Sequence, residues 1–144
     1  MFNNGKRSAF AGSGGEIVQG RAEAARPTGS MNKTLFERIA AGEIPANIVY
    51  EDDLVIAFRD IKPAAPCHVL VVPRKAIARI AEAKSEDKEL LGHLVLKAAE
   101  IAEKVGLKAS GFRLVINNGP DAGESVPHLH MHILGGRHMS WPPG

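Results

Sequence analysis

The chain lacks the features that mark several large classes of protein. Its 144 residues include a single cysteine, Cys67, so neither a disulfide framework nor a cysteine-rich zinc site can form within it. No apolar run approaches the roughly 20 residues that span a bilayer, which gives no reason to expect a membrane protein. A lone thiol fits a reducing compartment, and we therefore expect a cytoplasmic protein.

An excess of charge of either sign is also lacking. The chain has 18 basic and 16 acidic residues, and the difference comes entirely from residues 1–30, so residues 31–144 carry 14 of each. A balanced domain gives no electrostatic reason to expect nucleic acid or a membrane surface as a partner. An apolar content of 44% with 24% charged residues is ordinary for one globular domain with a single core.

Residues 1–30 differ in composition from the rest of the chain. They are rich in Gly, Ala, Ser and Arg, poor in large aliphatic residues, and show no sustained hydrophobic period. We interpret them as a disordered leader, a tag or a misplaced start, with a transit peptide as the alternative because the segment carries arginines and few acids. The folded domain is expected to cover residues 31–144.

From residue 34 onward the pattern predicts regular structure. Residues 34–37, Thr-Leu-Phe-Glu, form a capping box that predicts a short helix ending at Gly42. The longest helix is expected between Ser85 and Gly106, where an apolar stripe repeats at helical spacing. Strands are expected at 48–50, 54–58, 68–72, 112–117 and along the histidine-rich run that starts at residue 128. Because strands and helices do not alternate regularly, we predict an α+β domain with a mainly antiparallel sheet of about five strands.

Three histidines at alternate positions, His128, His130 and His132, are the most informative residues. Alternation is the period of a strand, so one extended strand would direct all three imidazoles to one face and the intervening aliphatic residues into a core. The ordinary pKa of imidazole lies nearest to physiological pH of any side chain. The pattern therefore indicates chemistry, either at a metal ion or through nucleophilic attack and proton transfer.

A metal site is one interpretation of this run. The outer two histidines of a straight strand lie about 13 Å apart, at roughly 3.3 Å per residue. That separation is too large for both to bind one zinc ion through bonds of about 2.1 Å. A metal site would need two of the three together with His68, and no carboxylate stands in a matching motif. A zinc hydrolase is kept as an alternative.

Nucleophilic catalysis is the other interpretation. A neutral imidazole attacks phosphorus, and the phosphoramidate that forms is readily hydrolysed. The segment before the histidines, residues 117–126, contains glycines that allow close backbone approach, and Ser125 supplies a hydroxyl. Backbone amides and a hydroxyl in such a loop can bind phosphoryl oxygens. A plain connection between strands is the alternative for this segment, which we call the glycine loop.

The run His-Leu-His-Met-His over residues 128–132, with aliphatic residues around it, resembles the signature of the histidine triad (HIT) family. Three further segments strengthen the resemblance: Phe-Arg-Asp-Ile at 58–61, Pro-Cys-His-Val-Leu-Val-Val-Pro at 66–73, and the ending from Gly-Gly-Arg to Trp-Pro-Pro-Gly at 135–144. Together they resemble the branch of histidine triad nucleotide-binding proteins from about residue 34 to the end. The sister branch, which cleaves dinucleoside polyphosphates, lacks the features of the last segment.

The resemblance implies a HIT-like α+β fold with one long helix and one short N-terminal helix. It also implies a homodimer joined through the long helix and a sheet edge, with no cofactor required. The activity implied is hydrolysis of the P–N bond of purine nucleoside phosphoramidates, which releases an amine and AMP or GMP. The alternatives are a nucleotide-binding regulatory or scaffold protein with incidental hydrolysis, and a dinucleoside polyphosphate hydrolase.

The resemblance also implies a role for each histidine. His130 would attack the α-phosphorus and form a nucleotidyl-histidine intermediate that water hydrolyses. His132 would contact the phosphate near the scissile bond, and His128 would orient His130 through its backbone carbonyl. His68 would complete the cluster from an adjacent strand.

Other residues of the implied site bind the nucleotide. Ser125 and Asn117 would contact the phosphate and the leaving group, with Gly123 as the residue of close approach, and Asp60 would bind the ribose hydroxyls. Trp141 would tune leaving-group preference from the tail. The implied apolar slot for the base consists of Leu35, Phe36, Ile39, Ile44, Phe58 and Ile61.

Glu124 and His138 depart from the pattern of the family. Glu124 stands where close relatives often carry glutamine, and a negative charge beside a phosphate is unfavourable unless the side chain points away. His138 differs from the pattern in animal members and lies in the tail.

Overall fold

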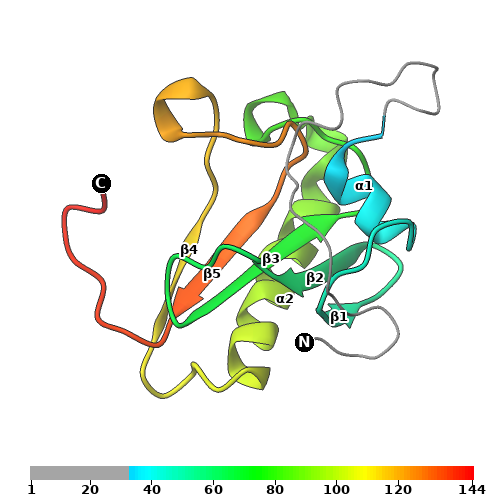
Figure 1. Ribbon diagram of the computed structural model, residues 1–144. Helices are drawn as coiled ribbons and strands as arrows, with labels where there is room; N and C mark the ends of the chain where they lie inside the picture. The colour runs from blue at the N-terminus through cyan, green and yellow to red at the C-terminus, as the bar shows by residue number, and fades with distance from the viewer. Residues whose placement is uncertain (1–32) are drawn as a thin grey trace.

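The computed structural model describes residues 33–144, so the interpretation of residues 1–30 lies outside the described part of the chain. Figure 1 shows the elements in chain order from α1 to the C-terminal tail. They are α1 (Leu35–Ala40), β1 (Ile48–Glu51), β2 (Val55–Arg59), β3 (Cys67–Pro73), the 3-10 turns η4 (Ile80–Glu82) and η5 (Ser85–Asp87), α2 (Lys88–Lys104), β4 (Phe112–Val115), the 3-10 turn η6 (Pro120–Ala122) and β5 (Met131–Gly135).

The strands form one five-stranded sheet in the order β1-β2-β3-β5-β4, and every neighbouring pair is antiparallel. This confirms the predicted α+β class and the expected number of strands. The last strand, β5, lies between β3 and β4, which leaves β4 at one edge of the sheet and β1 at the other. The central pair therefore joins the segment around His68 to the histidine-rich run.

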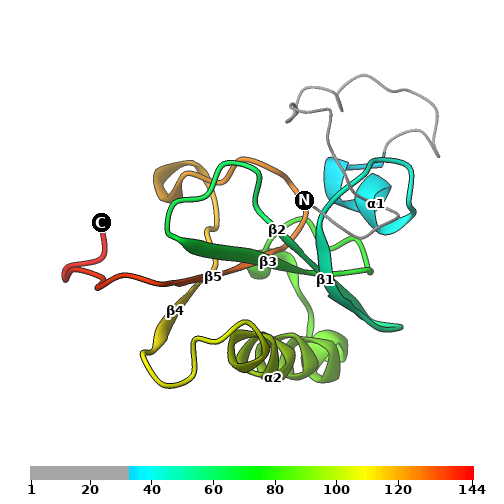
Figure 2. The ribbon, with the colours of Figure 1, turned by 60° about the horizontal axis from the view of Figure 1, so that its bottom comes forward.

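The sheet separates two apolar layers, with α2 against one face and α1 on the other (Figure 2). Alternate residues of β3 point to opposite faces, so Val69 and Val71 pack toward α2 while Leu70 and Val72 pack toward α1. The aliphatic residues of the histidine run, Leu129, Met131 and Ile133, are buried in the layer with α2. The histidines consequently lie on the side of the sheet that carries α1.

Helix α1 begins with the predicted capping box. The Thr34 hydroxyl accepts the Glu37 N–H at 3.1 Å, and the Glu37 carboxylate accepts the Thr34 N–H at 2.9 Å. Six residues are too few for an isolated helix to be stable in water, so burial of Phe36 and Ile39 must supply most of its stability. This packing places the ring of Phe36 next to the histidines.

The prediction of one strand from His128 onward is wrong in its boundary. Strand β5 begins at Met131, which pairs with Val71, and β3 ends two residues later at Pro73. Before that point the chain bends, because the His128 N–H is donated to the carbonyl of Val126 at 2.8 Å rather than to a strand partner. Side chains on both sides of this bend still alternate between the two faces of the sheet, but His128 and His130 lie outside the regular strand.

None of the helices within residues 33–144 combines the length and the apolar character that crossing a bilayer requires.

Gly135 at the end of β5 provides a test of packing. A Cβ at this position would lie 2.6 Å from the Cδ1 atom of Leu107, whose side chain is buried. We expect Gly135→Ala to lower the free energy of unfolding by about 1–3 kcal/mol, because a buried side chain must move to make room. The matched control is Gly92→Ala in α2, where a Cβ meets nothing within 4 Å. This substitution should raise the free energy of unfolding by about 0.5–1 kcal/mol, because alanine has the higher helix propensity. Urea unfolding measures both, and equal stability of the two variants would contradict the packing argument.

Candidate active site

Two histidines meet across the central pair of strands. In the register of β3 and β5, Leu70 lies opposite His132, which makes His68 a diagonal neighbour of His132 on the same face. Their rings lie 5.1 Å apart between centroids, and His68 Nε2 is 2.8 Å from His132 Nδ1. The strand pairing therefore brings His68 into contact with His132.

His130 lies next to His132, with 5.0 Å between the ring centroids. Its Nδ1 is 2.7 Å from the backbone carbonyl oxygen of His128, and the edge-on ring of Phe36 lies 4.9 Å away. A carbonyl oxygen can only accept, so Nδ1 of His130 carries the hydrogen of the neutral ring. The free lone pair of His130 is therefore on Nε2.

His128 is held in one orientation by two further hydrogen bonds. Its Nε2 donates to the Pro73 carbonyl at 2.8 Å, and its Nδ1 accepts the Thr34 hydroxyl at 3.0 Å. The oxygen of that hydroxyl also accepts the Glu37 N–H of the capping box. The cap of α1 thus fixes the residue whose carbonyl orients His130. The sequence showed Thr34 only as a cap, and no local pattern signals its second contact.

A second hydrogen-bond chain ends on His132. The Ala64 N–H is donated to His68 Nδ1 at 2.9 Å, so the ring hydrogen of neutral His68 is on Nε2 and is donated to His132 Nδ1. The hydrogen of neutral His132 is then on Nε2. This atom is buried and has no hydrogen-bond partner within residues 33–144. A buried donor without a partner is costly, which makes it a candidate contact for a bound substrate.

Burial keeps these rings neutral at physiological pH. It lowers the pKa values of His68, His128 and His130, and it lowers the pKa of His132 to about 4 with the help of the neighbouring imidazoles. The carboxylate of Asp60, with Oδ2 at 3.5 Å from His68 Nε2, opposes this effect on the pKa of His68. The site therefore offers one neutral acceptor, Nε2 of His130, beside one neutral donor, Nε2 of His132.

These lowered pKa values predict how stability depends on pH. Below the ordinary histidine pKa of about 6.5 the unfolded chain takes up protons that the folded site resists, so folding becomes less favourable as the pH falls. We expect the free energy of unfolding to decrease from pH 7.5 to 5, a range in which most carboxylates stay ionised. Urea unfolding measures the slope, and NMR titration of the rings should give midpoints below 6.5 for the four histidines. Midpoints at or above 6.5 would contradict the assigned environment.

Within residues 33–144, Asp60, His68 and His132 form a group that could offer ligand atoms to a metal, since one such atom from each lies within 4.8 Å of the others. Two nitrogen ligands of one tetrahedral zinc ion are about 3.4 Å apart, given bonds of about 2.1 Å. The 2.8 Å between His68 and His132 is the distance of a hydrogen bond. A metal ion could bind here only after that hydrogen bond opened.

The polar residues expected to bind the nucleotide lie on the segments around the histidines. Asn117 and Ser125 lie near the two ends of the glycine loop, Asn117 half-buried and Ser125 exposed. Gly123 follows η6 with φ of +80°, a conformation that favours glycine. One carboxylate oxygen of Asp60 accepts the Lys62 N–H at 2.8 Å, while the other faces His68.

Five of the six residues expected to line the base slot lie in one apolar cluster. Phe36, Ile39 and Phe58 are buried in one apolar cluster on the α1 side, and Leu35 and Ile44 pack against it. Ile61 does not join this cluster and is 66% exposed, because it follows β2 in a loop. The aromatic rings of Phe36 and Phe58 meet edge to face at 5.6 Å.

The C-terminal tail leaves the end of β5 and lies beyond β4, on the side of the sheet away from β1 (Figure 1). Trp141 is 80% exposed, and the guanidinium of Arg113 lies over its ring at 5.9 Å from the centroid. Arg113 also donates to the Ser140 carbonyl at 3.0 Å. These contacts place the tail along β4, at the edge of the sheet, and do not place Trp141 among the histidines.

Residues 41–139 match the HIT domain family. A HIT-like protein of Synechocystis sp. is 57% identical over 111 residues, which cover 77% of this chain and 96% of that protein. The crystal structure of a HIT family hydrolase from Legionella pneumophila Philadelphia 1 has a TM-score of 0.76 at 48% identity, covering 78% of this chain and 100% of that one. A histidine triad nucleotide-binding protein from Candida albicans has a TM-score of 0.66 at 25% identity, covering 76% and 83% of the two chains.

Proposed function

Because this chain belongs to the HIT domain family, we propose that it hydrolyses the P–N bond of purine nucleoside 5′-phosphoramidates. One observation carries the proposal. Two separate hydrogen-bond chains leave a free lone pair on His130 Nε2 and a free donor on His132 Nε2, on rings 5.0 Å apart. A nucleophile beside a donor is the pair that substitution at phosphorus with a poor leaving group requires.

In the proposed reaction, Nε2 of His130 forms a bond to the α-phosphorus while the P–N bond breaks. The electron pair of that bond leaves on the nitrogen, which accepts a hydrogen bond from the Nε2–H of neutral His132 and takes its proton from solvent. The positive charge on His130 is stabilised by the carbonyl of His128 at 2.7 Å from Nδ1. Water then attacks the nucleotidyl-histidine, supplies the oxygen of the monophosphate and releases a proton to solvent, which leaves His130 neutral again.

The nucleotide is proposed to lie against the face formed together by the histidines and α1. The cluster of Phe36, Ile39 and Phe58 supplies apolar contact for a purine, and the carboxylate of Asp60 can accept from the ribose hydroxyls. Asn117, Gly123 and Ser125 of the glycine loop are proposed to contact the phosphate. The Legionella protein is described as a hydrolase and the Candida protein as nucleotide-binding, which supports a nucleotide substrate here.

A homodimer belongs to the same proposal. Val95 and Leu96 of α2 and Phe112 of the edge strand β4 are exposed apolar side chains. An edge strand has unpaired backbone groups, and a second copy could cover both the strand and the helix. In such a dimer the tail with Trp141 would lie near the interface and could tune the choice of leaving group.

Turnover of adenosine 5′-phosphoramidate tests the proposed function, with AMP and ammonia as the expected products. Diadenosine polyphosphates serve as the comparison substrate, and kcat/KM should be higher for the phosphoramidate. The Gly-Gly-Arg and Trp-Pro-Pro-Gly segments support this preference. Higher kcat/KM for the polyphosphate would indicate the dinucleoside hydrolase instead. Tight binding of AMP without turnover would indicate a nucleotide-binding regulatory protein.

A further inference from the structure

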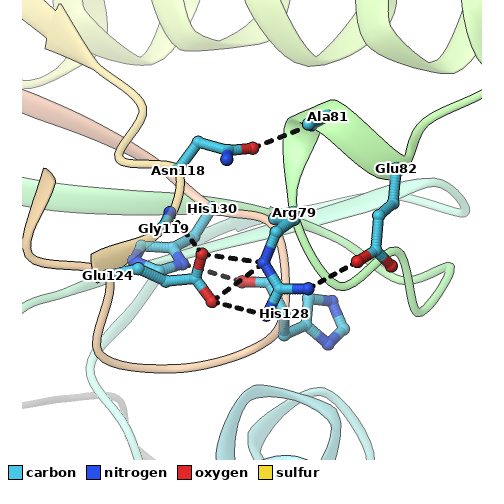
Figure 3. A network of polar contacts seen from close by, with 8 residues as sticks. All are labelled: Arg79, Ala81, Glu82, Asn118, Gly119, Glu124, His128 and His130. Carbon is cyan, nitrogen blue, oxygen red and sulfur yellow. Dashed lines mark hydrogen bonds and ion pairs between the residues drawn. The ribbon is translucent and has the colours of Figure 1, made fainter. Parts of the chain in front are cut away.

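The Glu124 carboxylate is held by three donors beside the candidate nucleophile. Arg79 binds it in a bidentate manner, with Nε at 2.9 Å from Oε1 and Nη2 at 2.8 Å from Oε2. The Gly119 N–H is donated to Oε1 at 2.7 Å. Figure 3 shows the carboxylate turned toward the guanidinium, with the Gly119 amide on its other side. The side chain of Glu124 is only 11% exposed.

These contacts close the glycine loop into a ring and attach it to a second segment. The Glu124 N–H is donated to the Gly119 carbonyl at 3.1 Å, so backbone and side chain of Glu124 both bind the same glycine. Arg79 comes directly before η4, and the Ala81 N–H of that turn is donated to the Asn118 side chain at 2.8 Å. The loop is therefore tied to the η4 segment at two points, one toward each end (Figure 3).

The same contacts keep the Glu124 side chain ionised and place a positive charge beside it. Arg79 and the Gly119 amide lower the pKa of Glu124 to about 2, so it is a carboxylate at every physiological pH. Its negative charge acts on His130, whose pKa it raises against the effect of burial. Without the guanidinium, a poorly solvated carboxylate would repel a phosphate bound at His130. Arg79 offsets that repulsion and fixes the loop at the same time.

We propose that Arg79 is a positioning residue for phosphate binding, acting through Glu124 to neutralise and shape the glycine loop. This proposal rests on the proposed function, because it assumes that the loop contacts the phosphate of a nucleotide. It explains how a glutamate is tolerated in a loop that is proposed to contact a phosphate. Arg79 itself need not touch the substrate.

The test uses four proteins: the wild type, Arg79→Gln, the double variant Arg79→Gln/Glu124→Gln, and Glu82→Gln. Arg79→Gln leaves the carboxylate unpaired, and we expect it to raise the Kd for AMP and lower kcat/KM for the phosphoramidate by about tenfold at low salt. In the double variant, the amide that replaces the carboxylate can still accept the Gly119 N–H and carries no charge. Both quantities should then return to within about threefold of wild type.

Glu82→Gln is the matched control. Glu82 forms an ion pair with the same guanidinium through Nη1, but its side chain is 55% exposed and does not contact the loop. This variant should bind AMP within about twofold of the wild type, since exposed ion pairs contribute little. The defect of Arg79→Gln should also shrink in 1 M salt, because screening weakens the repulsion. A purely structural loss would not respond to salt in this way.

Two results would overturn the proposal: wild-type AMP binding by Arg79→Gln, or a double variant as impaired as the single one. Thermal unfolding checks that each variant folds. If Arg79→Gln does not fold, the double variant decides, and a tenfold loss of AMP binding in it contradicts the proposal. AMP binding also separates this proposal from the proposed function. Failure of the wild type to hydrolyse the phosphoramidate refutes only the proposed function. Identical AMP binding by all four proteins refutes only the role of Arg79.

Discussion

Replacing His130 with alanine should lower kcat for adenosine 5′-phosphoramidate by at least about 10⁴-fold, because loss of a catalytic nucleophile removes the route through a covalent intermediate. AMP should still bind, since the apolar cluster around Phe36 and the carboxylate of Asp60 are unchanged. His130 is the only one of the four clustered histidines whose free nitrogen lone pair is not used by another group.

The control for this variant is His93→Ala. His93 lies on α2 and binds Asp52 at 2.8 Å, on an element that packs on the opposite face of the sheet from the histidine cluster. Its replacement should leave kcat unchanged. Calorimetry with AMP and thermal unfolding confirm that the His130 variant is folded. Activity of that variant within tenfold of the wild type would refute His130 as the nucleophile.

Replacing His132 with alanine should have the second largest effect, a loss in kcat of about 10²–10³-fold, the range typical of losing one preorganised hydrogen-bond donor at the reacting atoms. The unpartnered Nε2 of His132 is the only buried side-chain nitrogen or oxygen without a hydrogen bond within residues 33–144. A donor that serves the departing amine matters most when that amine is a poor leaving group. The loss should therefore depend on the leaving group.

A series of adenosine phosphoramidates with amines of decreasing basicity measures this dependence. For His132→Ala the defect should shrink as the leaving group improves, and it should be smallest for an activated acyl or imidazole derivative. A constant defect across the series would assign His132 to phosphate binding alone. The His130 variant should show no such trend, because it lacks the nucleophile for every substrate.

Much of this architecture can be predicted from local sequence patterns. Three features depend only on residues close together in the sequence, and the structure has all three. They are the Thr34–Glu37 capping box, the apolar stripe of α2 and the alternation around His130. The class of the fold follows from the order of these elements. The contact of His68 with His132 was expected from the resemblance, and the antiparallel register of β3 and β5 produces it.

Other features depend on contacts between distant segments and leave no local signal. The start of β5 at Met131 follows a distant contact, because the Leu129 N–H is donated to the carbonyl of Ile77 at 2.7 Å and not to β3. The second hydrogen bond of Thr34 joins residues 94 positions apart, and Arg79 meets Glu124 across 45 positions. Ile61 fits the pattern of an apolar slot, yet a loop turns it outward. The hydrogen bonds that surround Glu124 could therefore be found only from the structure.

The most direct test of the central claim is to trap the covalent intermediate. Rapid quenching during turnover of an adenosine phosphoramidate, followed by peptide mass spectrometry, should locate an adenylyl group on His130. The bond should be labile to acid, as expected for a phosphoramidate. Adenylylation of His132, His128 or His68 instead, or turnover with no nucleotidyl-enzyme at any time, would contradict the account.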